Sequence, residues 1–93
     1  MSYLNEDKGR LRRLATKEAI ALSMQSRWQE AAIANRQIIE SFPTDVDAYN
    51  RLGRALMELG KFAEAREAYS RALELDSHNT IARKNLERLS LLR

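Results

Sequence analysis

Apolar residues recur every three or four positions along five stretches of the chain, and polar residues fill most of the positions between them. In the third stretch, for example, Tyr49, Leu52 and Leu56 share one side of a helix. This period predicts helices over residues 28–41, 46–59, 62–75 and 80–92, after a first helix from residue 5 or 8 to residue 25. The connections are only two to five residues long, which favours antiparallel neighbours. The sequence therefore predicts an all-α fold.

Local signals for helix ends separate these stretches. Pro43 lacks an amide hydrogen and disfavours helix in the residue before it, so we expect the second helix to end there. Thr44 or Asp45 is the expected N-cap of the third helix, and Asn79 is the expected N-cap of the fifth. Gly60 follows the third helix, where a left-handed residue commonly closes a helix. These signals support the predicted boundaries independently of the apolar period.

The chain repeats itself at an offset of 34 residues. Four matching pairs are Ala21 and Ala55, Trp28 and Phe62, Glu30 and Glu64, and Ala31 and Ala65, and Ser26 stands at the place of Gly60. A repeat unit cannot bury its own apolar face and stacks on its neighbour instead. We therefore expect a single domain over residues 1–93, built as a helix-turn-helix solenoid. It has repeat one at about 12–45, repeat two at about 46–79 and a terminal helix at about 80–92.

Residues 46–79 carry a spaced pattern of small and aromatic residues, formed by Tyr49, Leu52, Gly53, Leu56, Ala65, Tyr69 and Ala72. The pattern resembles the tetratricopeptide repeat family, with Leu56 in place of an aromatic residue and Ser77 in place of proline. A glycine inside a helix costs roughly 0.5–1 kcal/mol relative to alanine, so Gly53 indicates that a neighbouring helix approaches closely there. The resemblance implies a right-handed superhelical stack, and it implies protein–protein interaction without catalysis.

The composition of the chain excludes several kinds of site. There is no cysteine, so disulfides and thiolate metal sites are excluded. His78 is the single histidine and lies in a polar turn, and no cluster has metal-ligand spacing. We therefore expect no catalytic residue, no metal and no cofactor. No apolar run approaches the roughly 18 residues of a membrane span, and no signal-peptide pattern opens the chain, so we expect a cytoplasmic protein and no membrane partner.

The net charge of +3 comes mainly from bases near both ends of the chain. In the family that the chain resembles, the first helix of each repeat lines a concave groove. The repeat register then gives nine candidate peptide-binding residues: Arg13, Lys17, Asn50, Arg51, Arg54, Met57, Lys84, Asn85 and Arg88. Bases and asparagines suit an acidic peptide or a free C-terminus. Some family members clamp a C-terminal carboxylate with lysine and asparagine, and the chain departs from that clamp because Thr16 and Ile20 stand at two of its places.

Three classes of function remain compatible with the sequence. The first is a non-catalytic interaction scaffold that binds a protein or peptide partner in the basic groove. The second is an oligomerisation module that forms a homodimer through the last helix, whose apolar residues lie on more than one side: Ile81, Leu86, Leu89, Leu91 and Leu92. The third is weak nucleic-acid binding by the basic ends, which is disfavoured because exposed aromatic residues are not interleaved with the bases. The chain can also be a fragment of a larger tetratricopeptide repeat protein.

Overall fold

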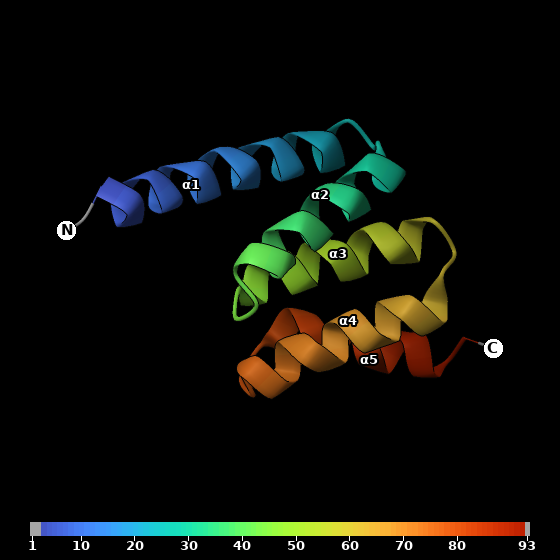
Figure 1. Ribbon diagram of the computed structural model, residues 1–93. Coiled ribbons are helices and arrows are strands. Elements are labelled where there is room, and N and C mark those ends of the chain that lie inside the picture. The colour runs from blue at the N-terminus through green and yellow to red at the C-terminus, as the bar shows by residue number, and fades with distance from the viewer. Residues whose placement is uncertain (1–2, 93) are drawn as a thin grey trace.

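The structure of the protein is a computed structural model that describes residues 3–92, with side chains from Asp7 to Leu92. Within that range the chain forms five helices: α1 (Tyr3–Met24), α2 (Trp28–Ser41), α3 (Val46–Glu58), α4 (Phe62–Leu75) and α5 (Thr80–Ser90). Each helix packs on the next in sequence, so the chain rises as a stack of antiparallel neighbours (Figure 1). The predicted all-α fold is confirmed. None of the described helices is both long enough and apolar enough to cross a bilayer.

The helix boundaries follow the sequence signals closely. The observed bounds of α2 and α4 are those predicted, whereas α1 begins earlier than expected, at Tyr3. The fifth helix ends at Ser90, two residues before its predicted end. There the amide groups of Leu91 and Leu92 donate to carbonyl groups three residues back, at Arg88 and Leu89. This tighter turn closes the helix.

Side chains and left-handed residues close the helix ends where the sequence indicates. Asp45, rather than Thr44, caps α3, because its Oδ1 accepts a hydrogen bond of 3.0 Å from the amide of Ala48. Asn79 caps α5 in the same way, accepting from the amide of Ala82 at 2.8 Å. Gly60 has a φ of 77° and Ser26, its counterpart in the first repeat, has a φ of 60°. Both helix-turn-helix units therefore turn through a left-handed residue, which costs serine more than glycine.

The core lies between α2, α3 and α4 and consists of small residues around one large ring. Ala31, Ala65 and Ala72 are fully buried, and the Tyr69 side chain is only 1% exposed. Gly53 is the point of closest approach, since a Cβ atom there would lie 2.7 Å from two ring carbons of Tyr69. The close approach predicted at Gly53 is therefore present, and its cause is the Tyr69 ring.

The first helix leaves part of its apolar surface uncovered. Ala15, Ala19 and Leu22 pack toward the rest of the chain, but Leu11 and Leu14 are exposed although they share the helical spacing. In the repeat register, Leu14 corresponds to Ala48, which lies fully buried in α3. No described element occupies the equivalent position beside α1, so these two leucines have no covering helix within residues 7–92.

The last helix packs the apolar residues of one side against the core. Leu89 and Ala82 are fully buried, and Leu86 packs against the same core. The guanidinium of Arg66 in α4 donates to the carbonyl of Leu89 at 3.2 Å, which fixes the end of α5. Because Leu86 and Leu89 belong to the chain's own core, they are not free to form the predicted homodimer contact. Self-association through the exposed residues of α5 stays a prediction.

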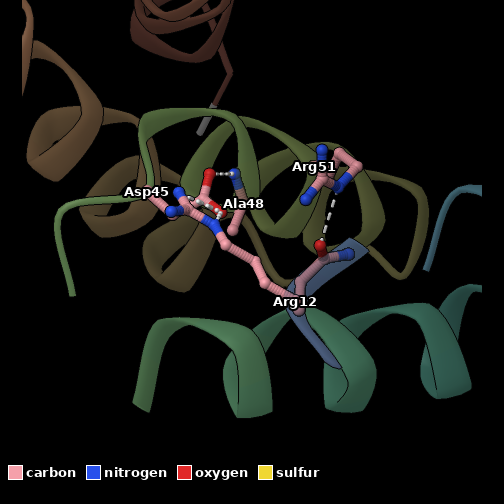
Figure 2. A network of polar contacts seen from close by, with 5 residues as sticks. Arg12, Asp45, Ala48 and Arg51 are labelled. Atoms are coloured by element: carbon pink, nitrogen blue, oxygen red, sulfur yellow. Dashed lines mark hydrogen bonds and ion pairs between the residues drawn. The ribbon is translucent and has the colours of Figure 1, made fainter. Parts of the chain in front are cut away.

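Asp45 joins the two repeats and carries a testable consequence. Its carboxylate caps α3 and also receives the Arg12 guanidinium of α1, at 3.1 Å (Figure 2). We expect Asp45→Ala to lower the free energy of unfolding by about 1–2 kcal/mol, because it removes the cap. Asp45→Asn keeps an acceptor for the amide of Ala48 and should cost less. Urea unfolding followed by circular dichroism measures both; equal losses would show that the ion pair, not the cap, stabilises this junction.

Candidate functional site

A groove of about 790 Å³ runs along one face of the stack, and α1, α3 and α5 supply most of its walls. These are the helices that the repeat register directs to the concave face. The lining residues are Ile20, Ser23, Met24, Trp28, Asn50, Arg51, Arg54, Met57, Glu58, Tyr69, Ile81, Asn85 and Arg88. The groove therefore combines three arginines and one glutamate with a larger set of apolar side chains.

Six of the nine predicted site residues line this groove, namely Asn50, Arg51, Arg54, Met57, Asn85 and Arg88. Arg13, Lys17 and Lys84 are exposed and are not among the lining residues. The neighbouring Arg12 pairs with Asp45 at the start of α3, whereas the Arg13 side chain is exposed outside the groove lining. Lys84 stands at the edge of the face formed by Ile81, Asn85 and Arg88. The groove is less basic than the sequence predicted.

A buried asparagine of α2 holds the Arg51 side chain in place through a hydrogen bond. The Nε of Arg51 donates at 2.8 Å to Oδ1 of Asn35, which is fully buried and in turn donates to the carbonyl of Ala31 at 2.9 Å. In Figure 2, Arg51 lies on α3 about one turn beyond Ala48, whose amide group donates to Asp45. The Nη2 of Arg51 is buried without a hydrogen-bond partner. Burial lowers the pKa of the Arg51 guanidinium, against the opposing effect of Asp45 and Asp47. Arg51 is thus a partly desolvated cation.

Arg54 is a weaker candidate for binding an acid because a carboxylate already neutralises it. Its Nε lies 3.1 Å from Oε2 of Glu58, one turn further along α3. Its guanidinium also lies over the Trp28 ring, 5.1 Å from the ring centroid. Arg88, on the opposite wall, makes no ion pair within residues 7–92, and neither does Arg51. The unneutralised positive charge of the groove therefore resides on Arg51 and Arg88.

The two asparagines of the groove use their amide groups internally. Asn50 donates through Nδ2 to Oδ1 of Asn79 at 3.1 Å, and its own Oδ1 is buried without a partner. Since Oδ1 of Asn79 also accepts from the amide of Ala82, the group of Asn50 that faces it must be a donor. Asn85 donates through Nδ2 to the carbonyl of Ile81 at 2.8 Å. Both residues therefore keep an amide oxygen that accepts no hydrogen bond from a described residue, and the oxygen of Asn50 is buried.

Tyr69 contributes to the floor of the groove from the core. Burial raises the pKa of its phenol to about 12, while the positive charges of Arg54 and Arg88 act in the opposite direction. The hydroxyl is consequently neutral at physiological pH and can donate a hydrogen bond. Among the described residues, no group of three or more histidine, cysteine or acidic side chains is arranged to hold a metal ion.

Sequence reasoning missed Asn35, Ser23, Trp28 and Tyr69 as contributors to this site. Trp28 and Tyr69 have core spacing, and that spacing does not reveal that a core ring also forms the floor of a groove. Asn35 had a usable signal, because it occupies the place of Tyr69 in the first repeat. A polar residue at a core position must be hydrogen-bonded, and here it positions Arg51.

The model of the tetratricopeptide repeat matches residues 46–79. Solved structures of the same fold superpose on nearly the whole stack of helices. Residues 46–79 match the tetratricopeptide repeat, and the described helices have the fold of tetratricopeptide repeat domains. The first tetratricopeptide repeat domain of Spaghetti (RPAP3), bound to the HSP90 peptide SRMEEVD, is 29% identical with a TM-score of 0.83, over 86% of this chain and 64% of that one. The Arabidopsis OM64 domain is 26% identical with a TM-score of 0.84, over 88% and 68%.

Two further relatives complete the comparison. The second tetratricopeptide repeat domain of human RPAP3, in complex with the HSP70 peptide SGPTIEEVD, is 26% identical with a TM-score of 0.80, over 85% of this chain and 66% of that one. Small glutamine-rich tetratricopeptide repeat-containing protein 2 from Mycosarcoma maydis is 46% identical over 39 residues, which are 42% of this chain and 11% of that protein. The chain thus spans about two thirds of the structures that it matches and a small part of this relative.

Proposed function

We infer that this tetratricopeptide repeat chain is a non-catalytic scaffold that binds a partner protein through a peptide in its groove. The observation that carries the proposal is the groove itself, in which α1, α3 and α5 bring separate parts of the sequence to one surface of about 790 Å³. Two unneutralised arginines there favour acidic peptides. Similar domains of RPAP3 were solved with the peptides SRMEEVD and SGPTIEEVD, which supports peptide binding as the activity. A cytoplasmic location stays a prediction.

The experiment compares binding of acidic, neutral and basic peptides of equal length by fluorescence anisotropy. Wild-type protein should bind the acidic peptides most tightly, and added salt should weaken that binding because charged contacts at an open groove are screened. Arg88→Glu should weaken binding of acidic peptides at least about tenfold. Lys84→Glu is the matched control, with the same charge change on the same helix outside the groove lining. It should change the Kd less than about threefold.

Two results would contradict the proposal. Equal affinity for the three classes of peptide would show that the arginines do not select the ligand. Equal losses in Arg88→Glu and Lys84→Glu would show that the net charge of the protein, not the groove, governs binding. Circular dichroism of both variants establishes that neither charge reversal unfolds the helices.

A further inference from the structure

We propose that the groove binds an internal, extended segment of its partner, with one acidic side chain flanked by large apolar side chains, rather than a free C-terminus. This inference rests on the proposed function and specifies the ligand class for the same groove. Its basis is the combination of two cations, two free acceptor oxygens and an apolar wall that the described side chains form together.

The hydrogen-bonding groups of the groove favour main-chain amides. The amide NH₂ groups of Asn50 and Asn85 donate to Asn79 and to the carbonyl of Ile81. Only the side-chain oxygens are left, and an oxygen can only accept a hydrogen bond. The Asn50 oxygen is buried without a partner, which is costly until a donor arrives. A continuing peptide supplies N–H groups on both sides of a bound residue. A chain end stops that supply on its C-terminal side.

The cations of the groove match a single acidic side chain. Arg51 lines the groove and is oriented by Asn35, so it loses little freedom when it binds a carboxylate. Arg88 adds a second positive charge from α5, whereas Glu58 neutralises Arg54. The groove therefore offers the ligand two positive charges from separate helices, of which Arg51 is already oriented by its hydrogen bond to buried Asn35. This one oriented guanidinium matches the carboxylate of a single acidic side chain.

The apolar wall matches large side chains beside that acid. Ile20 and Ile81 are 43% and 56% exposed, and they reach the groove from α1 and α5. Met57 of α3 and Met24 of α1 extend the same surface. Ile20 and Ile81 offer no hydrogen-bond donor to a terminal carboxylate. In an extended peptide, alternate side chains face the same way, so the pattern is apolar, any residue, acidic, any residue, apolar.

The test uses the peptide Ser-Gly-Leu-Ser-Glu-Ser-Leu-Gly-Ser, acetylated at its N-terminus, with either an amide or a free acid at its C-terminus. Both forms should bind with Kd values within about twofold of each other. Replacement of Glu by Gln, or of both Leu by Ser, should weaken binding at least about tenfold. Ile81→Asn in the protein should weaken it similarly. Ile33→Asn is the matched control, since Ile33 is also about half-exposed but lies outside the groove lining.

The possible outcomes separate this inference from the proposed function. If only free-acid peptides bind and Arg88→Glu abolishes that binding, the groove recognises a C-terminus; the inference is then overturned and the proposed function stands. If neither form of this peptide, nor any acidic peptide of the earlier panel, binds, both are overturned. If Ile81→Asn and Ile33→Asn reduce affinity equally, the apolar wall of the groove does not contact the ligand and the inference fails.

Discussion

Gly53→Leu is expected to lower the free energy of unfolding by about 3 kcal/mol, near the upper end of the usual range for overpacking a core. A Cβ alone at this position would lie 2.7 Å from the Tyr69 ring, and leucine adds three more carbons. The ring cannot move aside at low cost, because it is 1% exposed and belongs to a core cluster rich in buried alanines. The clash should therefore outweigh the gain of up to about 1 kcal/mol from replacing glycine inside a helix.

The measurement is urea unfolding followed by circular dichroism, with Gly9→Leu as the matched control. Gly9 also lies inside a helix, but a Cβ there would meet only the end of the Arg13 side chain, at 3.7 Å. That variant should be neutral or slightly stabilised. In a Tyr69→Leu background, which removes the ring, Gly53→Ala should no longer be destabilising. Equal stability of Gly53→Leu and Gly9→Leu would show that the contact between α3 and α4 is looser than the structure indicates.

Leu89→Ala is expected to lower the free energy of unfolding by about 3 kcal/mol and to reduce peptide binding. The side chain is 0% exposed and holds α5 against α4, so truncation leaves a cavity in the core. The Arg66 contact to the Leu89 carbonyl and the packing of Leu86 would then hold this end of the helix. Since α5 supplies Ile81, Asn85 and Arg88 to the groove, loosening it should disturb the candidate site.

Leu91→Ala is the matched control for this prediction, because Leu91 is 82% exposed and lies two residues further along the chain. It should change the stability by less than about 0.5 kcal/mol. Urea unfolding gives the stability difference, and amide hydrogen exchange shows whether α5 loses protection before the other helices. If the two variants are equally stable, Leu89 is not the residue that docks α5.

Much of the architecture was predictable because its causes are local in sequence. The bounds of α2 and α4 follow from the apolar period and the residues that flank it. Asp45 and Asn79 cap helices because a short side-chain acceptor can reach the amide three residues on, in any fold. The resemblance to tetratricopeptide repeats implied that the first helix of each repeat lines a groove, and the 34-residue register then assigned α1, α3 and α5 to its walls.

The tertiary structure decided which residues of those walls take part. A helical register fixes the direction of a side chain around its helix, but not how far one helix extends past the next. Arg13 and Lys17 are exposed on α1 outside the groove lining, whereas Ile20 and Met24 reach it. The Asn35–Arg51 contact joins residues 16 positions apart, and only the packing of α2 on α3 brings them to 2.8 Å. Burial of Leu89 likewise depended on how α5 rotates against α4. The sequence by itself determined the helices, their ends and their order in the stack; the axial offsets and rotations between helices determined the composition of the groove.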